Sequence, residues 1–197
     1  MQLRTALALS AFAALTAGTA NANLIITEWM ANPAELSDGD GEYFEVYNSG
    51  PGAITVADLT IHDDGTDSVD LAGAAGTIGA GEFFVFGASA LGYVDLNWDD
   101  FGSFFLGNSG DEIVVSLTAG GELARVDYTN GDPAGSGTAV ELDNIANPTV
   151  EGNFVASTTP LGTDFGSPGA AGNTVIPEPG SLALLGLGGL AMLRRRR

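Results

Sequence analysis

The sequence predicts an all-β sandwich for the body of this 197-residue chain. Short runs rich in β-branched and aromatic residues recur along it, and several alternate between apolar and polar positions. Clusters of Gly, Asp, Asn, Ser and Pro separate these runs, and no helical pattern of useful length lies between the two ends of the chain. Many short strands at close spacing are typical of a sandwich or barrel.

Alternation assigns the faces of the predicted strands. In the run 42–48, Phe44 and Val46 share one face, and Glu45 falls on the other face with Tyr43 and Tyr47. The residues that we expect to face inward are Phe44, Val46, Ile113, Val115 and Val126. The predicted strands are 24–30, 42–48, 54–61, 68–71, 82–86, 112–117, 123–128, 138–142 and 153–156.

Acidic residues dominate the body. The chain has 25 acidic and 6 basic residues, and five of the bases lie in the two terminal segments, which leaves 24 acids and the single base Arg125 between them. Such a surface repels nucleic acid and anionic membranes, and it favours divalent cations or cationic partners. A saline habitat would select a similar composition. There is no cysteine, which excludes disulfides, thiolate zinc sites and cysteine nucleophiles.

The N-terminus has the pattern of a secretory signal peptide. Arg4 precedes an apolar run, and Ala20-Asn21-Ala22 supplies the small residues of a cleavage site. We expect residues 1–22 to form a signal helix that is removed after Ala22 on export.

The C-terminus carries a Pro-Glu-Pro triplet, a short apolar run and a block of arginines, in that order. As a helix the uncharged run would span roughly 20 Å, whereas the hydrocarbon core of a bilayer is about 30 Å thick. We therefore expect a short transmembrane helix that holds the chain only transiently, with the arginines on the cytoplasmic side. The residues of this signal are Pro177, Glu178, Pro179, Arg194, Arg195, Arg196 and Arg197.

This tail resembles the PEP-CTERM sorting signal of bacteria. The resemblance implies that an exosortase-like membrane protease-transpeptidase recognises the triplet, removes the tail and delivers the body to the cell surface or extracellular matrix of a Gram-negative bacterium. The implied partners are this enzyme, the inner membrane transiently, and a protein or polysaccharide of the envelope or matrix. A plain C-terminal anchor or a frayed tail is the simpler alternative.

Seven segments of the body match, in order, the pattern of one further family. The opening strand 24–33 is followed by 42–48, which matches E-Y-x-E-I-x-N, and by 106–113, which matches L-x-N-x-G-D-x-I/V. Looser matches lie at 58–61, which lacks a Gly-Trp step, at 78–86, where Ala80 replaces proline, at 126–128, and at 166–173, which is similar to G-T-P-G-x-x-N. The body thus resembles the lamin tail domain, an immunoglobulin-like sandwich, and the resemblance implies an interaction module rather than a catalyst.

Two acidic loops are candidate calcium sites, because calcium takes about 6–8 oxygen ligands. The candidate ligands are Asp38, Asp40 and Glu42 in one loop, and Asp63, Asp64 and Asp67 in the other. Neither loop has the spacing of an EF-hand, and solvated turns are the simpler interpretation. His62, the only histidine, is interpreted as an exposed loop residue rather than a zinc ligand or a triad member.

Two other groups of residues have alternative interpretations. Glu28 and Glu45 could form the carboxylate pair of a glycosidase, but we expect solvation at strand edges or hydrogen bonds to neighbouring backbone instead. The aromatic loop either caps the core or forms a partner-binding surface. Its aromatic residues are Trp98, Phe101, Phe104 and Phe105.

The sequence divides into a signal peptide at 1–22, a sandwich at 23–145, a final segment and linker at 146–176 and a sorting signal at 177–197. The expected function is that of an exported, surface-sorted, non-catalytic binding or structural module, with no catalytic residues and no cofactor other than the candidate calcium. The alternative is a calcium- or carbohydrate-dependent matrix-binding module, and a hydrolase is a weaker third.

Processing of the tail is the first testable prediction. Mass spectrometry of the main surface species from the native host should find a protein that lacks residues 181–197, because the apolar run is too short for a comfortable permanent span. Recovery of these residues intact in that species would contradict the processing.

Overall fold

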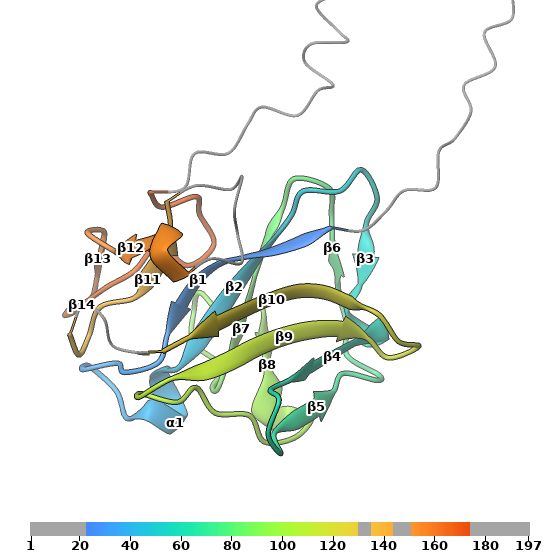
Figure 1. Cartoon of the computed structure of the whole chain (residues 1–197), viewed down its shortest axis with the longest axis horizontal. Helices are drawn as coiled ribbons and strands as arrows, with labels where there is room; N and C mark the ends of the chain where they lie inside the picture. The colour runs from blue at the N-terminus through green and yellow to red at the C-terminus, as the bar shows by residue number, and fades with distance from the viewer. Residues whose placement is uncertain (1–22, 130–134, 144–150, 174–197) are drawn as a thin grey trace, which may run out of the picture.

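The computed structural model describes residues 23–129, 135–143 and 151–173. Most of their strands form two sheets, one in front of the other in Figure 1, as in a β-sandwich. The signal helix expected at 1–22 and the transmembrane helix expected in 177–197 lie outside these residues. Across the described ranges, no helix has the length and apolar character needed to cross a bilayer.

The larger sheet has six strands in the order β12-β11-β1-β2-β7-β8. Neighbouring strands are antiparallel except for β7 and β8, which are parallel. The bounds are β1 (Leu24–Met30), β2 (Tyr43–Asn48), β7 (Phe83–Gly87), β8 (Leu96–Asn97), β11 (Val140–Leu142) and β12 (Phe154–Ala156).

The smaller sheet has four antiparallel strands in the order β10-β9-β4-β5. Two short strand pairs, β3 with β6 and β13 with β14, complete the described structure. The bounds are β3 (Ile54–Thr55), β4 (Leu59–His62), β5 (Ser68–Asp70), β6 (Thr77–Ile78), β9 (Asp111–Leu117), β10 (Glu122–Tyr128), β13 (Pro160–Leu161) and β14 (Asp164–Phe165). A single helical turn, α1 (Asp38–Gly41), and three 3-10 turns, Val56–Asp58, Trp98–Asp100 and Glu151–Asn153, lie between strands.

The strand predicted at 54–61 is interrupted. The chain forms β3, a 3-10 turn and then β4, which also includes His62. Val56, Leu59 and Ile61 are all fully buried in the core, but residues three apart cannot lie on the same face of a continuous strand. The turn resolves this conflict, and it places His62 half-buried at a strand end rather than in an exposed loop.

The main core lies between the two sheets and is rich in aromatic rings. Phe44 of β2 stacks on Phe86 of β7 with ring centroids 5.1 Å apart, and Trp98 and Phe104 pack edge to face at 5.5 Å. Trp98 and Phe104 of the aromatic loop are fully buried and Phe101 packs against the core, whereas Phe105 is 54% exposed, so most of that loop caps the core. The inward residues expected from the alternation all belong to this core.

A second, smaller cluster covers the outer face of the six-stranded sheet. Met30, Tyr43, Val85 and Ala139 form it, and three half-buried residues pack against it, namely Tyr93, Val94 and Leu161. Every residue of β1 and β2 is therefore buried, on both faces of the sheet. We expected 146–176 to be a final strand and a linker, but the described part, 151–173, contains three short strands and packs on the sandwich beside β11 (Figure 1).

Alanine substitutions at two phenylalanines test which side chains form the core. Phe44→Ala should reduce the free energy of unfolding by about 3–5 kcal/mol, because it removes a fully buried ring. The matched control Phe105→Ala, at an exposed ring, should change it by less than about 0.5 kcal/mol. Urea unfolding measures both, and equal losses would contradict the packing described.

Candidate functional site

Three buried glutamates form a row across neighbouring strands of the six-stranded sheet. Glu28 of β1 lies directly opposite Glu45 of β2 on one side and Glu141 of β11 on the other. Each is only 1% exposed. Because side chains alternate along a strand, the row shares the outer face of the sheet with Tyr43, away from the main core.

The row binds the backbone of the last described segment, 166–173, which we call the C-terminal strap. The amide of Ser167 donates to Glu28 at 2.9 Å, that of Gly169 to Glu45 at 2.6 Å, and that of Asn173 to Glu141 at 2.8 Å. Each of the three carboxyls thus binds a different amide along the strap.

The strap passes close to the row, and glycine makes this approach feasible. Gly172 has a φ of +52°, and a Cβ at this position would lie 2.7 Å from the carboxyl carbon of Glu141. Any larger residue would therefore have to displace the Glu141 and Ser167 side chains or move the strap away from the sheet.

Hydroxyl groups complete the bonding of the row. Tyr43 Oη donates to Glu28, and Thr27 Oγ1 donates to Glu45 at 2.6 Å. Ser167 Oγ lies 2.7 Å from Glu28 Oε2 and 2.9 Å from Glu141 Oε1. A hydroxyl has one proton, so it can donate to only one of these carboxyls, and the second contact is a hydrogen bond only if the other carboxyl is protonated.

Burial makes such protonation favourable near neutral pH. It raises the pKa of Glu28 to about 7 and that of Glu45 to about 8, although the hydrogen bonds from Tyr43, Ser167 and Thr27 oppose the shift. Arg125, the one Lys or Arg among the described residues, lies on β10 of the other sheet, so no cation offsets the burial of this row.

The row cannot act on a bound sugar in this arrangement. A glycosidase pair needs two carboxyls beside an open cleft, and here the strap covers both Glu28 and Glu45 and uses their oxygens. The expectation of backbone hydrogen bonding holds for both residues, but the partner segment lies more than 120 positions away, and neither residue is solvated.

A pocket of about 310 Å³ opens beside the row on the same face of the sheet. Met30 and Tyr43 are its buried residues on the sheet. The rest of its lining comes from the 33–36 loop, from Gly41 at the end of α1, from Leu91 and Tyr93, and from the β13–β14 hairpin.

The first candidate calcium loop directs its carboxylates to different partners. Asp38 accepts from Asn108 Nδ2 at 2.9 Å, Asp40 from Ser37 Oγ at 2.7 Å, and Glu42 turns inward to the Leu106 amide at 3.0 Å. Burial raises the pKa of Glu42 to about 8.

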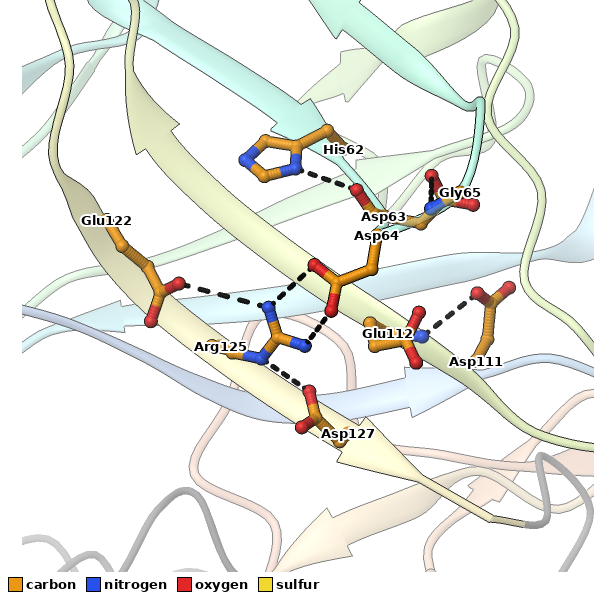
Figure 2. A network of polar contacts seen from close by, with 9 residues as sticks. All are labelled: His62, Asp63, Asp64, Gly65, Asp111, Glu112, Glu122, Arg125 and Asp127. Carbon is orange, nitrogen blue, oxygen red and sulfur yellow. Dashed lines mark hydrogen bonds and ion pairs between the residues drawn. The ribbon is translucent and has the colours of Figure 1, made fainter.

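The second candidate loop is tied to Arg125, as Figure 2 shows. Asp63 accepts from the Gly65 and Asp67 amides at 2.9 and 3.0 Å, while Asp64 turns away and forms a two-pronged ion pair with Arg125. Arg125 Nε also lies 2.6 Å from Asp127. His62 contacts the Asp63 carbonyl and Ser116 Oγ.

Calcium binding at either loop stays a prediction. Among the residues that the structure describes, no group of three or more Asp, Glu or His side chains is arranged to hold a metal. Titration calorimetry with CaCl₂ tests the idea, and absence of both heat and thermal shift at millimolar calcium would reject it.

Comparison with known families now identifies the body. The model of the Lamin Tail Domain family matches residues 17–130, more than half of the chain. The chain belongs to this family. A second model, the PEP-CTERM protein-sorting motif, matches residues 175–197, and such motifs mark proteins for export and sorting to the cell surface in Gram-negative bacteria. A search of curated proteins found no significant match.

Several residues of the site were not identified from the sequence. Glu141, Asp164 and Tyr93 were not singled out, and the strap with Ser167 was quoted only as the closing segment of the family pattern, without a structural role. Both the strap and β14 lie beyond the stretch matched by the lamin tail model. A signal was present, because Glu28 and Glu45 interrupt otherwise apolar strands, and a carboxylate at such a position needs a donor from elsewhere in the chain.

Glu28 and Glu45 predict a fold that loses stability as the pH rises. Burial raises the pKa of these two carboxyls above the ordinary value of 4.5, to about 7 and about 8, so the folded chain binds more protons than the unfolded chain between the ordinary and the raised values. This stabilisation is complete below the ordinary value and is lost as the pH rises through 7 and 8. The urea midpoint should therefore fall between about pH 5.5 and about pH 8.5.

Two glutamine variants separate this effect from general charge repulsion. Glu45→Gln removes a titrating group of the row and should reduce the decrease of the urea midpoint with rising pH. Glu82→Gln, at an exposed position, should leave that decrease unchanged. A midpoint that stays constant or rises over this range in the parent protein would contradict the account.

The Arg125 network predicts a salt-dependent contribution to stability. Arg125→Gln should lower Tm because Asp64 and Asp127 lose the cation that they share, and the loss should shrink in 1 M NaCl because salt screens exposed charges. Asp70→Asn on β5, outside this network, serves as the control in thermal unfolding. An equal loss of Tm at low and high salt would show that packing, not charge, accounts for the effect.

Proposed function

We propose that this lamin tail protein is processed by an exosortase-type enzyme and displayed at the cell surface or in the extracellular matrix as a non-catalytic binding or structural module. The observation that carries the proposal is the position of the sorting motif. It begins at residue 175, two positions after Asn173, whose amide is bonded to Glu141 on the folded body, so the sorting motif follows closely in sequence on a residue that packs on the sandwich.

The strap suits this arrangement. Removal of the tail would leave the end of the chain only a few residues beyond Asn173, whose amide is bonded to Glu141. The row of glutamates would then hold the last residues of the processed chain against the sheet, close to the point of attachment. Such an attachment would hold the domain in a defined orientation.

Two properties of the body support a non-catalytic role. Glu28 and Glu45, the carboxylate pair considered for a glycosidase, are covered by the strap and bonded to it. The body also carries 24 acids and one base, a charge distribution that favours binding of cationic partners over nucleic acid or anionic lipid.

Localisation of a tagged chain tests the proposal. The full chain should reach the surface, and a chain that ends before Pro177 should be released or retained elsewhere. Within the triplet, Glu178→Ala should reduce surface display, whereas Glu151→Ala, the same change outside the motif, should not. Identical sorting of the truncated and full chains would overturn the proposal.

A further inference from the structure

The pocket beside the row has a fixed negative rim. Asp164 is 6% exposed, and its oxygens accept from the amides of Ala34 and Glu35 at 3.1–3.2 Å. Glu35 in turn accepts from the Thr163 amide at 2.8 Å. The 34–35 loop and the β13–β14 hairpin thus hold each other through two carboxylates whose partners are neutral groups.

The negative field reaches into the pocket. Tyr93 lines it, and burial, followed by the charges of Asp164, Glu35 and Glu28, raises the pKa of this phenol to about 12. The one cation of the described residues, Arg125, is already held by Asp64 and Asp127 on the other sheet. Among the described residues, the carboxylates of the rim therefore have amide and hydroxyl partners and no cationic one.

The rest of the lining is apolar and aromatic. Leu36 is 41% exposed although it lines the pocket, and Leu91 and Leu161 are half-buried. The Tyr43 and Tyr93 rings meet edge to face with centroids 5.5 Å apart. Apolar walls suit an aliphatic stem, and a half-buried tyrosine ring suits the face of a cation.

We propose that this pocket binds an arginine or lysine side chain presented by a partner polypeptide. The methylene stem would lie along Leu36, Leu91 and Leu161, and the charged end would reach Glu35, Asp164 and the ring of Tyr93. Charge complementarity favours this occupant. The rim would repel an anion, and a neutral apolar group would leave the carboxylates of the rim without a cationic partner. The volume of about 310 Å³ lies at the small end of the range for ligand sites and suits one long side chain.

The inference rests on the proposed binding role and names the chemistry of the partner. Its failure can be distinguished from a failure of that role, because surface display of a Glu35→Gln chain is measured separately by localisation. Display without pocket binding would overturn only the present inference.

A peptide titration followed by NMR tests the pocket. The probe is acetyl-Gly-Arg-Gly-amide, added to the ¹⁵N-labelled full chain in a non-ionic detergent with about 150 mM NaCl, a concentration that screens exposed charges beyond about 8 Å. Saturable shifts should concentrate on the amides of Leu36, Leu91 and Leu161. The neutral peptide acetyl-Gly-Gln-Gly-amide should bind at least about tenfold more weakly.

Variants with matched controls decide between the pocket and general attraction to an acidic surface. Glu35→Gln and Tyr93→Ala should each weaken binding of the arginine peptide by about tenfold, whereas Asp100→Asn, an equal change of charge at an exposed position, should not. Equal losses for Glu35→Gln and Asp100→Asn, shifts spread over the whole surface without saturation, or equal binding of the neutral peptide would each overturn the proposal.

Discussion

The structure depends on the hydrogen bonds between three buried carboxyls and the backbone of a segment remote in sequence. Glu28, Glu45 and Glu141 lie in the middle of a sheet, where an unbonded carboxylate would be strongly unfavourable. The amides of the C-terminal strap supply the donors: that of Ser167 is buried, and those of Gly169 and Asn173 belong to residues at the surface. The strap therefore has to close over the sheet for the three carboxyls to be bonded.

That closure gives the domain a third layer on one side. The β13–β14 hairpin and the strap lie over the outer face of the six-stranded sheet, where Tyr43 is buried, and the hairpin forms one wall of the acidic pocket. The same layer leads directly to the sorting motif. The proposed attachment, the predicted pH dependence and the proposed ligand site thus all depend on one packing arrangement, while the opposite sheet carries the Arg125 network and its exposed charges.

Much of the sandwich could be predicted from local pattern. The bounds of β1 agree with the expected 24–30, and the alternation in β2 correctly placed Phe44 and Val46 in the core, because strand period and apolar burial are local properties. The burial of Glu28 and Glu45 could not be predicted in this way, since it depends on donors more than 120 residues away. The pocket could not be predicted for the same reason, because Glu35 and Asp164 come together only in the folded chain.

Native-state hydrogen exchange of the strap tests the central claim most directly. If the row holds the strap, the amides of Ser167, Gly169 and Asn173 should exchange nearly as slowly as those of β1, and Glu28→Gln combined with Glu45→Gln should accelerate the strap far more than the strands. Exchange of the strap amides at the rate of an unstructured chain, while β1 stays protected, would show that the strap is not part of the fold and would contradict the account.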